Sequence, residues 1–379
     1  MIYLDNASTT FPFDEVLETY IKYSKNNFFN PSTIYKAGKN NSVLEEKIKS
    51  KILEFLKIKN KKIIFTSSAT EANNLAIFGY LLPKANKGYN IITTNIEHKS
   101  VFNAFKFLES NGFEVRYLHI NNNHQISIEE LNSLIDKNTI FCSVMAVNNE
   151  TGNILNIDEV KKTLNGKRII FHSDFAQTLF KTNLSLCSIP DMFTISSHKI
   201  HGLKSIAALI YDEKILLQPQ ILGGGQEYGI RSSTVDIPLI ASFFKAIEIN
   251  EKRWLNDYKI VEELYKYAIS KLNSLQYILI NSFKENYSPY ILNFSLLNGV
   301  KASVVLEGLS NKEIYVSSIS ACSSKGEEPS YVIYNLFDDK NRAANAIRIS
   351  FSSSNTKEEI DTLIKELDDI VKKGLWETK

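Results

Sequence analysis

Residues 194–202 read TISSHKIHG and place one lysine, Lys199, just beyond a short apolar segment. Twenty-five residues earlier, the stretch HSDFAQ at residues 172–177 contains Asp174. A lysine and an aspartate at neighbouring strand ends suit pyridoxal phosphate, because the amine forms a Schiff base with the cofactor aldehyde and the carboxylate pairs with the pyridinium nitrogen. The two residues therefore indicate an enzyme that uses this cofactor.

Around these residues, short apolar segments of strand length alternate with longer amphipathic segments. We expect strands at residues 63–66, 90–93, 114–119, 139–147, 168–172, 192–196 and 205–211, and helices at 71–80, 100–111 and 128–134. The strand segments are β-branched and lack clean alternation, which is typical of strands buried on both faces. The pattern predicts an α/β fold with a mainly parallel seven-stranded sheet and a site beyond the carboxyl ends of its strands.

A second, smaller unit is expected after a long helical pattern at residues 237–275. It would contain strands at residues 277–281, 290–296, 314–317 and 346–350 and a final helix at 356–373. The 379 residues also exceed the roughly 100 to 150 that are usual for one domain. We predict a large cofactor-binding domain over residues 14–255 and a small α+β domain formed by residues 1–13 and 256–379.

The composition narrows the classes of function. Lys and Arg total 44 against 42 Asp and Glu, a net charge of +2, so electrostatics favours neither nucleic acid nor a membrane surface as partner. The chain has no apolar run of about 18 residues and no pattern of a signal peptide, so we expect a soluble cytoplasmic protein. Three cysteines without metal-ligand spacing indicate neither a disulfide framework nor a zinc site. Cys142 and Cys187 lie among apolar residues and are assigned to packing.

Four other segments carry candidate site residues. Residues 66–74 (TSSATEANN) follow a strand and open a helix, so they could hold a phosphate or simply cap the helix. His98 lies at a strand-to-helix junction, where it could stack on a cofactor ring and move protons, or be structural. Residues 146–152 (AVNNETG) carry amides that must find partners, either in a ligand or in the loop. Residues 223–234, with three glycines followed by hydroxyls, are a weak signal alone.

Nearly from end to end, the sequence resembles the cysteine desulfurases of the class V branch of fold-type I pyridoxal-phosphate enzymes. The resemblance runs from YLDNASTT at residues 3–10, through NPS at 30–32, to IRIS at 347–350. It is most specific at residues 320–324 (SACSS), followed by EPSYV at 328–332, which is similar to the catalytic loop of NifS/IscS-like enzymes.

The resemblance implies a role in the reaction for five residues. Lys199 would bind the cofactor covalently, Asp174 would pair with its ring nitrogen, and Gln177 would donate to its ring hydroxyl. His98 would stack on the ring and serve as acid and base. Removing sulfur from L-cysteine also needs a nucleophile that attacks the substrate sulfur, for which a thiolate is well suited. Cys322 would be this nucleophile and would carry the persulfide while L-alanine forms.

Other residues would hold the cofactor and the substrate. The phosphate of pyridoxal 5′-phosphate would be bound by Ala69, Thr70, Ser196 and His198, with Thr234 reaching it from a second subunit. Asn149 would bind the cofactor edge and the substrate. Arg348 would bind the substrate carboxylate, which a guanidinium fork matches bidentately.

Some positions depart from the family's usual pattern. Leu203 stands at a usual proline, and Ser197 and Ser205 stand at usual glycines. Further departures are Tyr35 at a common histidine, Lys39 at a common arginine, and Ile319 and Lys325 in the cysteine loop. The departures indicate a divergent or specialised member, with phosphate-loop geometry and partner recognition affected more than the chemistry.

The resemblance also implies a homodimer that gives its sulfur to an acceptor protein, such as an iron-sulfur scaffold or a tRNA or DNA thiolation enzyme. Three alternatives stay open. A selenocysteine lyase would use the same residues. A class V aminotransferase or kynureninase-like enzyme would need no thiol at Cys322. An inactive scaffold that docks sulfur acceptors would have no reason to retain Lys199, Asp174, His98 and Arg348 as well.

Overall fold

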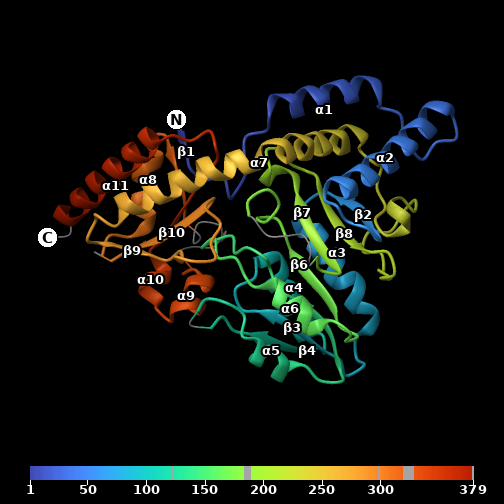
Figure 1. The fold of residues 1–379 in the computed structure, drawn as a ribbon, viewed down its shortest axis with the longest axis horizontal. Coiled ribbons are helices and arrows are strands. Elements are labelled where there is room, and N and C mark those ends of the chain that lie inside the picture. The colour runs from blue at the N-terminus through green and yellow to red at the C-terminus, as the bar shows by residue number, and fades with distance from the viewer. Residues whose placement is uncertain (122, 183–188, 298, 319–327, 378–379) are drawn as a thin grey trace.

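The computed structural model describes residues 1–121, 123–182, 189–297, 299–318 and 328–377. A large and a small unit lie side by side and share one long helix, α7 (Ile237–Leu272) (Figure 1). The predictions made for Cys187 and for Ile319, Cys322 and Lys325 lie outside the described residues.

The large unit is built on a seven-stranded sheet with the order β2-β8-β7-β6-β5-β3-β4. The strands are β2 (Lys61–Thr66), β3 (Asn90–Thr94), β4 (Glu114–Leu118), β5 (Thr139–Ser143), β6 (Ile170–Asp174), β7 (Met192–Ser196) and β8 (Ala207–Asp212). In the described sheet only β8 runs against its neighbours, and the other pairings follow parallel register. The predicted α/β fold with a mainly parallel seven-stranded sheet is confirmed.

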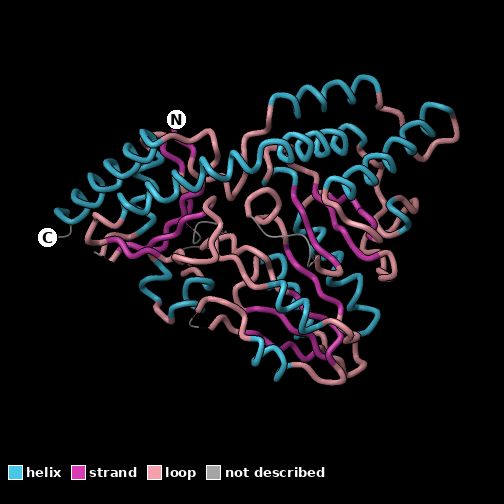
Figure 2. The backbone as a smooth tube through the Cα atoms, viewed as in Figure 1, coloured by secondary structure: helices cyan, strands magenta, loops and turns pink. Residues whose placement is uncertain are grey.

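Helices cover both faces of this sheet (Figure 2). One face packs against α2 (Lys36–Phe55), α5 (Ile128–Leu134), α6 (Ile157–Leu164) and the first half of α7, and the other against α3 (Ala69–Leu81) and α4 (Lys99–Ser110). Because side chains alternate across a strand, Ile63 and Phe65 join the first core and Ile64 the second. Both faces are apolar, which explains the missing alternation. Cys142 is fully buried in β5, as predicted for a packing residue.

The small unit has a four-stranded antiparallel sheet with the order β12-β13-β10-β9. Its strands are β9 (Ile278–Ile280), β10 (Ile291–Leu296), β12 (Ser317–Ser318) and β13 (Ala346–Ser350). Its helices are α8 (Ala302–Ser310), α9 (Tyr331–Phe337), α10 (Lys340–Ala344) and α11 (Lys357–Glu377). The N-terminal strand β1 (Ile2–Tyr3) pairs with β11 (Ile314–Tyr315) in this unit.

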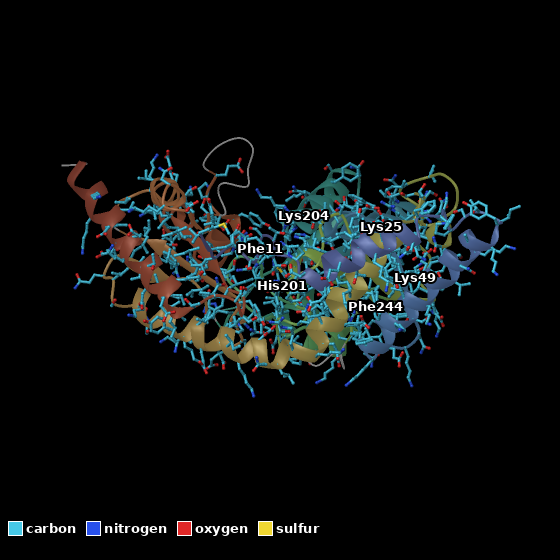
Figure 3. The ribbon with its side chains drawn as sticks, turned by 90° about the horizontal axis from the view of Figure 1, so that it is seen from above. Phe11, Lys25, Lys49, His201, Lys204 and Phe244 are labelled. Carbon is cyan, nitrogen blue, oxygen red and sulfur yellow. The ribbon has the colours of Figure 1, made fainter. Side chains whose placement is uncertain are left out.

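Helix α7 contributes to the cores of both units. Ile240 and Phe243 pack in the large unit, whereas Val261 and Leu264 pack in the small one. The boundary predicted between residues 255 and 256 therefore falls inside a continuous helix, and the division into two domains stays a prediction. Figure 3 shows α1 (Asp14–Asn26) lying along α7. Within the described ranges, neither α7 nor any other helix is long and apolar enough to cross a membrane.

Two strand predictions were wrong in their extent. The strand predicted at residues 139–147 ends at Ser143, although Val144 and Ala146 still donate backbone hydrogen bonds to β6. Its last residue, Val147, instead forms a bridge with Ile154, because the chain turns back there. The strand predicted at 314–317 is two short strands, β11 and β12, which pair with different partners.

Candidate active site

A cavity of about 380 Å³ lies at the carboxyl ends of the large-unit strands and is closed on one side by the N-terminal segment and β13. Its volume lies within the range of roughly 300 to 1,000 Å³ that is usual for small-molecule sites. The predicted residues that line it are Ala69, Thr70, His98, Asn149, Asp174, Gln177, His198, Lys199 and Arg348. The fold thus brings together residues that are far apart in the sequence.

Lys199 reaches the cavity from a short 3-10 turn directly after β7. Its Nζ donates hydrogen bonds to the carbonyl oxygens of Ala7 (2.5 Å) and Ser8 (2.7 Å). The same N-terminal segment holds the turn from the other side, because the backbone N–H and the hydroxyl of Thr10 both donate to the carbonyl of His198. The N-terminal segment therefore sets where the lysine amine lies.

Asp174 is the last residue of β6 and is 6% exposed. One carboxylate oxygen accepts from Asn73 Nδ2 on α3 at 2.7 Å, and the other accepts from the backbone N–H of Ala176 at 2.8 Å. Two donors from different elements fix the plane of this carboxylate. It can therefore meet a cationic ring nitrogen in the cavity in a defined orientation.

His98 is the N-cap residue of α4, and its Nδ1 accepts from the backbone N–H of Ser100 at 3.1 Å. An accepting Nδ1 places the proton of the neutral imidazole on Nε2. The side chain is exposed to the cavity, but the surrounding protein atoms desolvate it and lower its pKa below 6.5. Nearby Asp174 opposes this shift, whereas Lys199 adds to it. At neutral pH the ring is therefore uncharged, with its proton on Nε2 and its lone pair on Nδ1.

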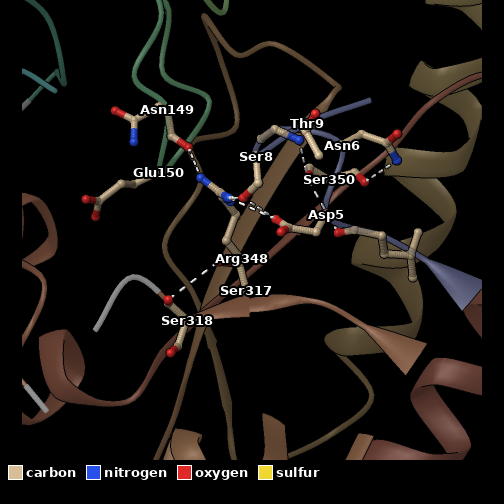
Figure 4. Close-up of polar contacts among 12 residues, drawn as sticks. Asp5, Asn6, Ser8, Thr9, Asn149, Glu150, Ser317, Ser318, Arg348 and Ser350 are labelled. Carbon is tan, nitrogen blue, oxygen red and sulfur yellow. Dashed lines mark hydrogen bonds and ion pairs between the residues drawn. The ribbon is translucent and has the colours of Figure 1, made fainter. Parts of the chain in front are cut away.

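Arg348 on β13 is held by three oxygen atoms (Figure 4). One terminal nitrogen donates to the carbonyl of Asn149 at 2.8 Å, and the other donates to Asp5 Oδ1 at 2.9 Å and Ser8 Oγ at 2.7 Å. Two polar atoms here, Arg348 Nε and Asn149 Oδ1, are buried without a partner among the described residues. Buried polar groups are normally satisfied, so a ligand that pairs with them would complete the site.

The start of α3 also lines the cavity. Ser68 caps the helix by accepting from the N–H of Glu71, and Ala69 and Thr70 follow as its first residues. The first N–H groups of a helix lack partners within the helix and favour an anion such as phosphate. His198 faces the same cavity, and its burial together with Lys199 lowers its pKa to about 4.

Gln177 is oriented by one hydrogen-bond acceptor and one hydrogen-bond donor. Its Nε2 donates to the Ala7 carbonyl at 2.8 Å, and its Oε1 accepts from Lys181 Nζ at 3.1 Å. Lys181 is buried, which lowers the pKa of its amine well below 10.5. The sequence analysis did not identify Lys181, because a lysine four residues after a glutamine carries no distinctive signal.

Of the described residues, two that were predicted for the site, Ser196 and Thr234, do not line this cavity. Ser196 is buried at the end of β7, and its hydroxyl has no partner among the described residues. Thr234 is exposed and lines a separate cavity of about 240 Å³. Cys322 lies outside the described residues, but Ser317 before it and Tyr331 after it both line the main cavity.

Two of the unusual residues near Lys199, Ser205 and Ser197, constrain the backbone around them. Ser205 has a backbone φ of +66°, a left-handed conformation in which glycine is unstrained. Ser197 is fully buried, and its Oγ lies 2.0 Å from the position that a Cβ on Gly202 would occupy. A side chain on residue 202 is therefore excluded.

Several lining residues were missed, namely Ala7, Ser8, Ser68, Lys99, Met145, Val147, Glu150, Ala176, Ser317 and Tyr331. Glu150 is the most informative, because it is a carboxylate with only 3% exposure. Desolvation raises its pKa to about 7, against the opposing influence of Ser330 and Arg348. The apolar run that ends at Val147, three residues before it, is the sequence signal that could have marked it as a buried acid.

Comparison with known proteins identifies the family. The class-V aminotransferase family matches residues 2–363. This chain belongs to that family. Among its relatives, a NifS/IcsS protein homolog of Lactobacillus delbrueckii subsp. bulgaricus is 36% identical, with 98% of this chain and 97% of that protein covered. Cysteine desulfurase IscS 1 of Archaeoglobus fulgidus is also 36% identical, with 98% and 97% covered.

A solved structure described as a NifS-like protein superimposes with a TM-score of 0.90. It is 32% identical to this class-V chain, and the match covers 98% of this chain and 99% of the other. The predicted family and the fold-type I architecture are therefore confirmed.

Enzymes of this class-V family depend on pyridoxal 5′-phosphate, so the predicted cofactor is confirmed. The residues present fit it. A carboxylate held by two donors, an amine just beyond the next strand, the start of α3 and Asn149 line one cavity, and Asn149 Oδ1 is buried without a partner among the described residues. Asp174 would hold the ring nitrogen, Lys199 the aldehyde carbon, and Ala69, Thr70 and His198 the phosphate.

Proposed function

We propose that this chain is a pyridoxal-phosphate-dependent cysteine desulfurase that converts L-cysteine to L-alanine and leaves the sulfur on Cys322 as a persulfide. The observation that carries the proposal is a single cavity that joins Lys199, Asp174, His98 and Arg348. The relatives named cysteine desulfurase support it. L-Cysteine is the substrate, and the overall exchange converts L-cysteine and the Cys322 thiol into L-alanine and the Cys322 persulfide.

The bound cofactor supplies an electron-withdrawing ring conjugated to the substrate Cα. Arg348 fixes the substrate by its carboxylate, and Asn149 Oδ1 accepts a hydrogen bond at the same edge. Lys199 Nζ removes the proton from the substrate Cα and can return one to the product. His98, which is neutral at pH 7 and carries its proton on Nε2, can donate a hydrogen bond through Nε2 to the reacting groups. Asp174, whose carboxylate is fixed by Asn73 and Ala176, would hold the ring nitrogen and favour its protonated form.

The Cys322 thiolate attacks the substrate Sγ, so that a sulfur–sulfur bond forms and the substrate carbon–sulfur bond breaks. The described residues on either side of the segment that carries Cys322 support this step, because they line the cavity. Ser317 lines the cavity five residues before Cys322, and five residues span at most about 18 Å when fully extended. Tyr331 lines the cavity on the other side of the segment.

The experiment compares Cys322→Ser with the control Cys142→Ala, which changes a buried thiol in β5. We expect Cys322→Ser to bind pyridoxal phosphate and to lose both alanine and sulfide production from L-cysteine. Cys142→Ala should keep both products. Full alanine production by Cys322→Ser would contradict the proposal.

We further propose a homodimer in which Thr234 of one subunit reaches the phosphate of the other. The exposure of Thr234, outside the cavity of its own chain, supports this arrangement. Mixing Lys199→Ala subunits with Thr234→Ala subunits should then restore one intact site per mixed dimer. No recovery of activity in dimers shown to be mixed would argue against a shared site.

The persulfide is passed on to a sulfur-acceptor protein, such as an iron-sulfur scaffold or a tRNA or DNA thiolation enzyme, and neither nucleic acid nor membrane is bound directly. A reducing compartment keeps the Cys322 thiol available, so we propose a cytoplasmic location. Co-purification of the tagged protein after mild crosslinking, with Cys322→Ser as the matched control, would identify the acceptor. Localisation of the tagged protein in fractionated cells tests the compartment.

A further inference from the structure

Glu150 is a buried carboxylate on the cavity surface with no role in the mechanism above. It follows Asn149 directly, and its backbone is fixed because its N–H donates to Asn148 Oδ1 and its carbonyl accepts from Asn293 Nδ2. Its Oε2 accepts a 2.5 Å hydrogen bond from the hydroxyl of Ser330.

Ser330 is the N-cap residue of α9, the first helix after the segment that carries Cys322. Its Oγ accepts from the N–H of Ile333 at 3.0 Å, while its hydroxyl hydrogen is donated to Glu150. A hydroxyl has a single hydrogen, so these two bonds define its orientation. The start of α9 is thus tied to the β5–α6 loop of the large unit.

Three further contacts hold the start of α9 against the segment that carries His98. The hydroxyl of Tyr331 donates to the carbonyl of Glu97, and its ring stacks on Phe102 of α4 with centroids 5.1 Å apart. Asn335 Nδ2 donates to the carbonyl of Asn95 at 2.8 Å. Val332 is fully buried in the core of the large unit. The bond between Glu150 and Ser330 is therefore one of several contacts that fix the start of α9 against the large unit, eight residues after Cys322.

A carboxylate at this position is expensive for the fold. Glu150 forms no ion pair among the described residues, and burying an ionised group costs far more than burying an amide that could accept the same bond. Its charge is favoured by the positive fields of Arg348 on β13 and Lys99 on α4, which both line the cavity. Ionisable groups kept in such surroundings are typical of functional sites.

We propose that Glu150 is a positioning residue for sulfur transfer, holding Ser330 so that the segment carrying Cys322 is attached to the cavity wall at a fixed point. The inference rests on the proposed function, since it concerns the transfer step to Cys322. It assigns no contact between Glu150 and the cofactor. Loss of the bond should slow the arrival of Cys322 at the substrate sulfur while leaving substrate binding intact.

The test uses the holoenzyme and two separate readouts in a single turnover. The change in cofactor absorbance on adding L-cysteine reports substrate binding, and labelling of the protein persulfide reports sulfur transfer. Glu150→Ala and Ser330→Ala should each slow persulfide formation by about 10- to 100-fold, which is the range expected for a hydrogen bond to a charged group. The absorbance change should stay within about two-fold of wild type, a margin well below one hydrogen bond.

The double variant and a conservative variant complete the design. Glu150→Ala combined with Ser330→Ala should be no slower than the slower single variant, because both remove the same bond. Ser330→Thr keeps the hydroxyl and should transfer sulfur at close to the wild-type rate. Thermal unfolding of each variant identifies any that fail to fold. If an alanine variant does not fold, the rate of persulfide formation is compared between Ser330→Thr and the alanine variant that does fold.

Several outcomes would overturn the inference. They are wild-type persulfide formation in both alanine variants, fully additive losses in the double variant, loss of sulfur transfer in Ser330→Thr, or an equal loss in the absorbance response. Cys322→Ser, run in parallel, separates this inference from the proposed function. If Cys322→Ser still produces alanine at the full rate, the proposed function fails. If only Cys322→Ser loses sulfur transfer, the function stands and the role of Glu150 fails.

Discussion

Replacing Glu150 by glutamine should stabilise the protein relative to wild type, and the difference in the free energy of unfolding should grow as the pH rises. Burial raises the pKa of this carboxyl from 4.5 to about 7. Below pH 4.5 it is protonated in both the folded and the unfolded chain, so it has no differential effect. Between pH 4.5 and 7 the unfolded chain loses the proton first, so the wild-type free energy of unfolding falls with rising pH. Above pH 7 the loss is complete, at about 3 kcal/mol for a gap of this size.

Glutamine has no proton to lose, so the stability difference between Glu150→Gln and wild type should grow by about 2 to 3 kcal/mol from pH 5 to pH 8.5. Globular proteins gain about 2 cal/mol/K of unfolding entropy per residue, so in a chain of 379 residues this equals a relative rise in Tm of about 3 °C. Comparing the variant at two pH values cancels any difference in packing between the amide and the protonated acid.

The assay is differential scanning calorimetry of both proteins, saturated with pyridoxal phosphate, at pH 5 and pH 8.5. Glu358→Gln is the control, because hydrogen bonds at the start of α11 lower the pKa of that exposed carboxyl. Its effect on Tm should therefore be nearly the same at both pH values, because this carboxyl titrates below pH 4.5 and is ionised in the folded and the unfolded chain throughout the assay range. A Tm difference for Glu150→Gln that is the same at both pH values would refute the reasoning.

Four other predictions follow from the geometry. Arg348→Lys loses the fork that bonds Asp5, Ser8 and the Asn149 carbonyl, so steady-state assays should show a KM for L-cysteine about 10- to 100-fold higher, with a smaller change in kcat. Protonation of His98 should lower kcat at acid pH. Because the pKa of His98 is lowered, this fall in a pH profile of kcat should lie below pH 6.5, and it should be absent in His98→Gln. Lys181→Met removes the donor to Gln177 but also a costly buried amine, so equilibrium dialysis should show weaker cofactor binding without a fall in Tm. Ser205→Gly relieves a left-handed φ and should raise Tm by about 1 °C, and an unchanged or lower Tm would contradict the assigned strain.

The sheet was predictable because its strands are short, β-branched and buried on both faces. The first helices were not, because their apolar faces are thin. In α1, for example, only Val16 is fully buried, whereas Leu17 and Ile21 remain exposed. The error at residues 139–147 has a different cause. The apolar run continues past Ser143 because those residues line the core and the cavity, although the regular strand has ended.

The identities of the site residues came largely from resemblance, but the contacts that hold them did not. Asn73, which orients Asp174, lies in the middle of a helix that reads as an ordinary capped one. Ala7 contributes only its carbonyl oxygen, which no side-chain pattern can mark. The bond between Glu150 and Ser330 joins residues 180 positions apart. Such long-range contacts appear only once the chain is folded.

The N-terminal segment shows why these contacts matter for the whole site. The carbonyl of Ala7 accepts from both Lys199 and Gln177, which belong to the large unit. In the same segment, Asp5 and Ser8 accept hydrogen bonds from Arg348 of the small unit. One short segment thus contacts both the Lys199 amine, which we propose removes the substrate α-proton, and the Arg348 guanidinium, which we propose binds the substrate carboxylate. A shift of one unit relative to the other would break these bonds, so the hydrogen bonds of this segment fix the spacing between Lys199 and Arg348.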